Sequence, residues 1–222
     1  MDIQAPVDKR AVIERIKSER AVAVIRTDSI ERALRTADAV VAGGFQAIEI
    51  TFSFADAARA IENLAKNNER NLLIGAGTIL TREQVQEAVQ AGARFLVSPC
   101  VLPEVINAAD EFEVAVIPGA FTPTEIYTAY SLGAEIVKIF PAVKFGPEYL
   151  RALRGPLPNI QIMPTSGVDA SNVGDWFRAG AVAVGAVSSV LDPELIRTGA
   201  WDEITKRARE FMDAVRAADG HP

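Results

Sequence analysis

The 222-residue sequence is poor in the residues that build several common kinds of site. It has one cysteine, Cys100, which excludes an internal disulfide bond and fits a reducing compartment. Its one histidine, His221, stands in the C-terminal tail. Histidine-ligated metal centres and serine–histidine triads are therefore not expected.

The chain also lacks a surplus of basic residues and long apolar runs. Its net charge is -6 and its pI is about 5.0, which argues against nucleic acid or an anionic membrane as a partner. The negative net charge is still compatible with an anionic small-molecule ligand if a few cationic side chains lie around its binding site. No uninterrupted apolar run reaches about 18 residues, and no signal-peptide pattern opens the sequence. We expect a cytoplasmic protein.

A short apolar run followed by a helical pattern recurs eight times. The expected strands start near residues 21, 47, 72, 94, 114, 135, 160 and 182, at intervals of 20 to 26 residues. Repeated βα units of this size predict an α/β fold, a single-domain (β/α)₈ TIM barrel spanning residues 1–222, with residues 1–20 as an N-terminal helix across one end. An open doubly wound sheet is disfavoured, because no Gly-x-Gly-x-x-Gly fingerprint follows the first strand.

Apolar periodicity and capping residues give the expected helices. These are Val7 to Arg20, a helix capped by Asp28 or Ser29 that reaches Gly43-Gly44, Asp56 to Asn67, Thr81 to Ala91, Pro103 to Ala109, Thr124 to Leu132, Ser171 to Ala179, and a last helical stretch that follows Ser189 and reaches Ala217.

The strand from Glu135 to Pro141 carries a lysine, Lys138, among β-branched residues. An unpaired ammonium in an apolar setting is costly, and a buried lysine that loses its proton becomes a nucleophile. The alternative is a structural lysine that extends its amine to water or pairs with a carboxylate.

In a barrel, chemistry is expected where strands end at their carboxyl side. The residues found there are Arg26, Glu49, Thr51, Thr78, Ser98, Pro99, Lys138, Phe140, Thr165, Ser166, Gly167 and Ser188. Alternate residues of a strand share a face, so Glu49 and Thr51 point the same way, as do Lys138 and Phe140. If both pairs face inward, a carboxylate and an amine converge on one pocket. A structural Glu49–Lys138 ion pair is the alternative.

The loops after the seventh and eighth strands hold small and hydroxyl residues: Ser166, Gly167 and Ser188. In barrels these loops often bind phosphate through backbone N–H groups, with ordinary turn chemistry as the alternative. Arg26 could supply a cation for the anion or be a solvated surface residue.

Taken together, these motifs resemble those of the bacterial 2-keto-3-deoxy-6-phosphogluconate / 4-hydroxy-2-oxoglutarate aldolases, which are class I Schiff-base lyases with a (β/α)₈ fold. The resemblance runs from Ala21 to about Ala217. Its motifs are Ala42-Gly43-Gly44, Ile48-Glu49-Ile50-Thr51, Ile74-Gly75-Ala76-Gly77-Thr78, Val97-Ser98-Pro99, Ile117-Pro118-Gly119, Val137-Lys138-Ile139-Phe140-Pro141-Ala142 and Met163-Pro164-Thr165-Ser166-Gly167.

The resemblance implies that Lys138 forms the Schiff base and that Glu49 is the general acid/base. It places Thr78, Pro99, Phe140 and Thr165 in the pyruvyl pocket, and Gly167 and Ser188 in the phosphate site. It also implies a homotrimer with no metal or organic cofactor, acting on a small anionic keto acid in the Entner–Doudoroff pathway.

Three residues depart from the family pattern. Ser53 stands where some members have an arginine that helps hold the substrate carboxylate. Ser166 replaces the first glycine of Pro-Thr-Gly-Gly, and Val187 replaces a glycine before the phosphate-site serine. The last two lie in the proposed phosphate site and leave the distal anion open.

The predicted reaction is cleavage of 2-keto-3-deoxy-6-phosphogluconate to pyruvate and glyceraldehyde 3-phosphate. The alternatives for the substrate are 4-hydroxy-2-oxoglutarate, the 6-phosphogalactonate compound and a sulfonated analogue. The alternatives for the activity are a phosphosugar lyase or isomerase that uses Lys138 only as a charge, and a non-catalytic sugar-acid-binding barrel.

Overall fold

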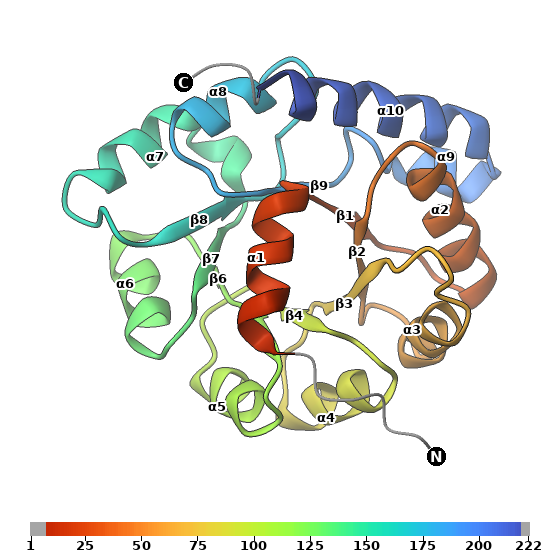
Figure 1. Cartoon of the computed structure of the whole chain (residues 1–222), viewed down its shortest axis with the longest axis horizontal. Coiled ribbons are helices and arrows are strands. Elements are labelled where there is room, and N and C mark those ends of the chain that lie inside the picture. The colour runs from red at the N-terminus through yellow and green to blue at the C-terminus, as the bar shows by residue number, and fades with distance from the viewer. Residues whose placement is uncertain (1–7, 219–222) are drawn as a thin grey trace.

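The structure, a computed structural model, describes residues 8–218, so Val7 and His221 lie outside the described residues. Its parallel strands form a closed barrel (Figure 1). The strands are β1 (Ala21–Ile25), β2 (Ala47–Thr51), β3 (Leu73–Gly77), β4 (Phe95–Val97), β5 (Ala115–Ile117), β6 (Gly119–Ala120), β7 (Ile136–Ile139), β8 (Gln161–Pro164) and β9 (Val184–Ala186). They start within two residues of the predicted positions, apart from the division of the fifth strand into β5 and β6.

Pro118 explains this division, because proline has no N–H to donate to a neighbouring strand. Before it, β5 pairs with β4, and after it, β6 pairs with β7. The strands therefore form a six-stranded sheet, β5-β4-β3-β2-β1-β9, and a three-stranded sheet, β6-β7-β8. A single bridge between Thr165 and Gly185 joins β8 to β9 and completes the ring.

The helices surround this ring (Figure 1). They are α1 (Lys9–Glu19), α2 (Ile30–Ala42), α3 (Ala57–Lys66), α4 (Arg82–Gln90), α5 (Pro103–Glu111), α6 (Pro123–Ser131), the 3-10 turn η1 (Ala142–Lys144), α7 (Pro147–Arg154), α8 (Val173–Arg178), α9 (Pro193–Thr198) and α10 (Trp201–Ala217). None of those within the described range is long and apolar enough to cross a membrane.

Two features differ from the sequence-based helices. Helix α7 was not among them, although Pro147 at its first turn and the buried Leu150 and Leu153 are helix signals. The last predicted stretch is two helices, because Gly199 ends α9 in the left-handed conformation with φ of 71°.

Side-chain caps fix where several helices begin. Ser29 accepts a hydrogen bond from the backbone N–H of Arg32 at 3.4 Å, and α2 follows it as expected. At α6, Thr122 and Glu125 form a capping box, which starts the helix one residue earlier than the apolar pattern indicated.

Helix α1 lies across the amino-terminal end of the barrel (Figure 1). Its side chains Val12, Ile13 and Ile16 are buried in one cluster with the first inward-facing side chains of the strands, such as Phe95 and Ile136. This packing fills the amino-terminal end with apolar atoms. The polar groups inside the barrel therefore lie nearer its carboxyl-terminal end.

Candidate active site

The alternation along β2 directs Glu49 into the barrel. Ala47, two residues earlier, belongs to the interior cluster, whereas Ile48 and Ile50 pack in the outer core against the helices. Because side chains alternate along a strand, Glu49 and Thr51 share the inward face with Ala47. Glu49 is only 1% exposed, so its carboxyl group is buried.

The same alternation holds along β7 for Lys138. Ile136 lies in the interior cluster, while Val137 and Ile139 lie in the outer core. Lys138 is therefore directed inward, beside its register partner Met163 on β8, and it is 6% exposed. The structure thus brings the predicted carboxylate and amine into the interior of one barrel.

Burial dominates the electrostatics of this pair. Desolvation lowers the pKa of Lys138, opposed by the charge of Glu49 and assisted by the positive charge of Arg26. Desolvation raises the pKa of Glu49, opposed by Lys138 and then Arg26. Within residues 8–218 the two side chains form no ion pair at 4.0 Å or less, so the direct salt bridge considered from the sequence is not made. Both shifts favour a neutral amine and a protonated carboxyl.

The carboxyl group of Glu49 lies against a glycine. A Cβ atom built on Gly77 would stand 1.7 Å from Glu49 Oε1, so only glycine leaves room for the carboxyl group in this position. Glu49 Oε2 is buried and has no hydrogen-bond partner. The sequence analysis named Gly77 only as part of a motif. Its position opposite Thr51 of β2, on the inward face, is the feature that could have identified it as a neighbour of Glu49.

A second unpaired polar atom is the hydroxyl oxygen of Thr165, which follows β8. Thr165 is 1% exposed, and its Oγ1 has no hydrogen-bond partner. A buried polar atom without a partner costs free energy, and native sites that keep one often use it to bind a ligand or water.

Arg26 reaches across the mouth of the barrel. It follows β1, and its guanidinium donates to Thr78 Oγ1, beyond β3, at 3.4 Å. The side chain therefore passes over the end of β2, where Glu49 and Thr51 lie. Arg26 is exposed and forms no ion pair with any described residue. A guanidinium in this position can bind an anionic ligand at the mouth.

Thr51 differs from the other candidates, because its hydroxyl is already engaged. It donates to the carbonyl of Ile25 at 3.2 Å and lies 2.8 Å from Ser53 Oγ. Thr51 thus ties β2 to β1. Ser53 is exposed at the same rim.

Phe140 lies above the amine. The centroid of its ring is 5.1 Å from Lys138 Nζ, and the residue is 38% exposed. Pro99, after β4, is half-buried, and its carbonyl oxygen would be 2.4 Å from a Cβ on Gly119, the register partner of Lys138. Phe140 therefore borders the amine, and Pro99 lies against the strand that pairs with Lys138.

The candidates for the distal anion lie after β8 and β9. Ser166 and Gly167 have positive φ values of 72° and 84°, which turn the backbone sharply. Ser188 is exposed, and the next residue, Ser189, donates its hydroxyl to the carbonyl of Val168 at 2.8 Å. Ser189 thus links the two loops, a role that the sequence did not reveal.

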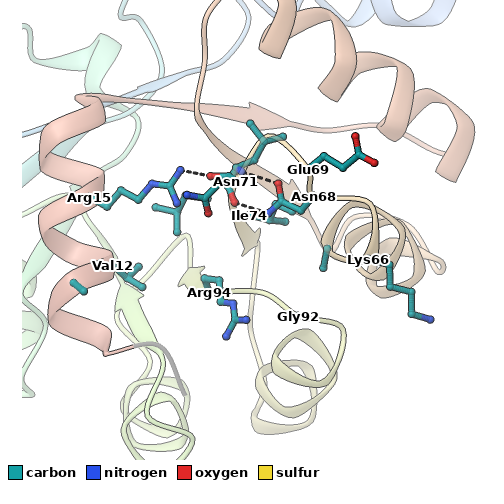
Figure 2. Close-up of a pocket in the computed structure, with 13 residues that line it drawn as sticks. Val12, Arg15, Lys66, Asn68, Glu69, Asn71, Ile74, Gly92 and Arg94 are labelled. Carbon is teal, nitrogen blue, oxygen red and sulfur yellow. Dashed lines mark hydrogen bonds between the residues drawn. The ribbon is translucent and has the colours of Figure 1, made fainter. Parts of the chain in front are cut away.

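A separate cleft of about 590 Å³ lies at the opposite, amino-terminal end, between α1 and the loop before β3 (Figure 2). Arg15 donates there to the carbonyl of Asn71. Lys66, which also lines the cleft, is paired with Glu62 at 2.5 Å. Arg15 and Lys66 are thus engaged within the fold, and the cleft lies at the end of the barrel opposite the carboxyl ends of the strands, so the candidate active site is the one at the carboxyl-terminal end. Across the described part of the chain, no three His, Cys, Asp or Glu residues are grouped so that they could hold a metal ion.

Comparisons with known proteins find similar sequences over most of this chain. A family model described as "KDPG and KHG aldolase" matches residues 12–207. The 2-dehydro-3-deoxy-phosphogluconate aldolase of Haemophilus influenzae is 34% identical over 206 residues, covering 92% of this chain and 97% of the relative. The 2-dehydro-3-deoxy-6-phosphogalactonate aldolase of Escherichia coli is 35% identical over 199 residues, covering 89% and 95%.

Among solved structures, a KDPG aldolase from Legionella pneumophila matches with a TM-score of 0.82 and 31% identity, over 92% of this chain and 98% of that chain. It was captured with pyruvate as a covalent carbinolamine intermediate. The likeness confirms the predicted (β/α)₈ barrel and the resemblance that the motifs carried.

Proposed function

Because the chain belongs to the KDPG and KHG aldolase family, we propose that it cleaves 2-keto-3-deoxy-6-phosphogluconate to pyruvate and glyceraldehyde 3-phosphate through a Schiff base on Lys138. The observation that best supports this proposal is the inward-facing, buried amine of Lys138, whose pKa is lowered by desolvation. A neutral amine is the nucleophile that imine formation requires.

In the proposed reaction the neutral amine of Lys138 attacks the C2 ketone of the substrate. Loss of water gives a protonated imine, which withdraws electrons from the C3–C4 bond. That bond breaks as the C4 hydroxyl loses its proton, which leaves the aldehyde and an enamine. Protonation at C3 and hydrolysis of the imine then release pyruvate and regenerate the lysine.

Glu49 is the proposed proton carrier for these steps, directly or through a water molecule. Its raised pKa brings the carboxyl group nearer to working pH, where a side chain can both accept and donate a proton. Its unpaired Oε2 supplies a position at which a substrate hydroxyl or a water can bind. The carboxyl group thus alternates between base at C4 and acid at C3.

We assign the remaining predicted residues by their positions. Arg26 at the mouth and the unpaired hydroxyl of Thr165 are the proposed partners of the substrate carboxylate. Thr51 and Thr78 hold the rim on this side, and the remaining residues of the pyruvyl pocket and the anion site are Pro99, Phe140, Ser166, Gly167 and Ser188. No metal or organic cofactor enters these steps.

The decisive experiment is borohydride reduction in the presence of pyruvate. We expect a mass increase on Lys138 in the wild-type chain, none there in Lys138→Met, and an unchanged adduct in the control Lys144→Met, whose lysine is exposed. If no adduct forms on Lys138, the Schiff-base mechanism is wrong. Adduct formation without turnover of any sugar acid would instead favour a binding protein.

The substrate is tested by comparing kcat/KM for the phosphogluconate, phosphogalactonate and 4-hydroxy-2-oxoglutarate compounds. The phosphogalactonate compound is the leading alternative, because the Escherichia coli relative bears that name. If kcat/KM is clearly higher for one of the other two compounds, that compound replaces the phosphogluconate compound as the proposed substrate. The proposed Schiff-base mechanism on Lys138 is unaffected by that result.

A homotrimer in the cytoplasm is the proposed state of the enzyme. Four aromatic side chains on or near α6 are exposed: Phe121, Tyr127, Tyr130 and Phe145, of which Phe145 packs on Phe121. Glu125 is the only charged residue between positions 114 and 134. Aromatic enrichment and depletion of charge are typical of the cores of protein interfaces.

The assembly is tested with the double variant Tyr127→Glu and Tyr130→Glu. Sedimentation should give a mass of about three chains for the wild type and of one folded chain for the variant, since charges in a buried interface are costly. A wild-type chain that sediments as a monomer would contradict the proposal.

A further inference from the structure

The amine of Lys138 has one aromatic neighbour, and its geometry suits a cation. The ring centroid of Phe140 lies 5.1 Å from Nζ, within the distance of about 6 Å at which an aromatic face attracts a positive charge. Lys138 and Phe140 are two residues apart on the same face of the β7 segment. Phe140 is 38% exposed and Lys138 only 6% exposed, so the aromatic residue reaches the surface while the lysine is buried.

We propose that Phe140 is the electrostatic partner of the protonated imine, stabilising its positive charge through the face of the ring. This inference rests on the proposed Schiff base at Lys138. It gives Phe140 a role beyond lining an apolar pocket, because the ring would favour the cationic intermediate over the neutral amine from which it forms.

The charged groups near the amine leave this stabilisation incomplete. A charged Glu49 raises the pKa of Lys138, but it forms no ion pair with Lys138 at 4.0 Å or less within the described residues, and burial favours its neutral form. Arg26 is positive and disfavours a second cation nearby. Among the described residues, no other charged group shifts the pKa of Lys138. A positive imine therefore forms in an apolar setting where the quadrupole of the Phe140 ring is the neighbouring source of negative potential.

The physical argument also predicts a pH effect. The ring favours a protonated nitrogen on Lys138, both in the free amine and in the imine. Weakening the negative face of the ring should therefore lower the pH at which the free amine becomes reactive and reduce the stability of the imine. A residue that merely packs against the methyl group of pyruvate would change neither property when its shape is kept.

The experiment replaces Phe140 with phenylalanines of increasing ring fluorination, inserted at that codon alone in the full-length chain. Fluorination keeps the shape of the ring and weakens its negative face. Pyruvate is the probe, and imine is measured as the borohydride-trapped adduct on Lys138 as a function of pyruvate concentration and pH. The same series at Phe177 is the control, because that ring lies 3.8 Å from Arg20 Cζ in another cation–π contact, made by the residue that precedes β1.

We expect the apparent affinity for pyruvate in imine formation to fall stepwise at Phe140, by about tenfold across the series, with a shift of the pH profile to lower pH. Phe140→Leu should resemble the most fluorinated ring, and the Phe177 series should leave imine formation unchanged. Equal trapping across the Phe140 series would overturn the inference and leave the Schiff base intact. Absence of any adduct in the wild type would refute the proposed function, and the inference with it.

Discussion

The position of the Glu49 carboxyl group depends on the absence of a side chain at Gly77, so Gly77→Ala should displace it. The new Cβ would stand 1.7 Å from Oε1, 2.4 Å from Cδ and 2.7 Å from Cγ. Real contacts essentially never fall under 3.0 Å, so Oε1 must move from 1.7 Å to beyond 3.0 Å, by at least about 1.3 Å.

A displacement of this size is large for a proton carrier. Misplacement of a catalytic group by about 1 Å costs about 10²-fold in rate, which is the expected loss of kcat/KM in Gly77→Ala. The added methyl should also destabilise the barrel by about 1–3 kcal/mol through overpacking. The expected rate loss results from displacement of the Glu49 carboxyl group, and the expected stability loss results from crowding in the barrel interior.

The assay compares steady-state cleavage and thermal unfolding of Gly77→Ala with those of Gly155→Ala. Gly155 follows α7 with a helical φ of -58°, and its Cβ would meet nothing nearer than 3.6 Å, so the control should keep wild-type activity. Adding Glu49→Gln to Gly77→Ala should cost little more, because both changes disable one group. If the two losses multiply instead, Gly77 does not act through Glu49 and the reasoning is refuted.

Two further predictions follow from buried polar groups. Lys138→Met should abolish trapping with pyruvate and raise stability by about 1–4 kcal/mol, since a buried amine without an ion-pair partner among the described residues is replaced by apolar packing. Because the pKa of Lys138 is lowered in the folded chain, the unfolded chain binds more protons at pH values between that pKa and the ordinary 10.5. Wild-type stability therefore rises with pH across this window. The stability advantage of the Met variant is largest below the window and should shrink in denaturant titrations at increasing pH. Thr165→Val should stabilise the fold by about 1 kcal/mol, because it removes a buried hydroxyl without a partner, and should raise the KM for substrate; unchanged KM would argue against Thr165 as a ligand of the carboxylate.

Much of the fold could be predicted because the residues that determine each βα unit lie close together in the sequence. Apolar runs end at turn residues, and caps such as Ser29 start the helices that follow. What the sequence did not show depends on contacts between distant segments. Helix α7 was missed because its two buried leucines, Leu150 and Leu153, make too short a stripe to be separated from a loop. The change of partner at Pro118 likewise depends on where β4 and β7 lie.

The candidate site shows the same division. Strand alternation alone predicted that Glu49 shares a face with Thr51 and Lys138 with Phe140, but it left open whether these faces point inward; the structure shows that Glu49 and Lys138 face the barrel interior. The missing direct contact between the two, the reach of Arg26 to Thr78 and the space above Gly77 are set by the curvature of the barrel. No local pattern records these distances, so their consequences for catalysis could only be read from the three-dimensional arrangement.

The barrel consists of two hydrogen-bonded sheets, and the candidate site takes residues from both of them. Lys138 belongs to the three-stranded block and Glu49 to the six-stranded block. The blocks join at Pro118 and, on the other side, through the bridge from Thr165 to Gly185 and the hydrogen bond from the Val182 N–H to the carbonyl of Ile162. Opening at these seams would move Lys138 and Glu49 apart as parts of two bodies while each block keeps its internal pairing. Amide hydrogen exchange at the seams therefore reports how often the enzyme leaves its competent geometry, and ligands that span both blocks should slow it.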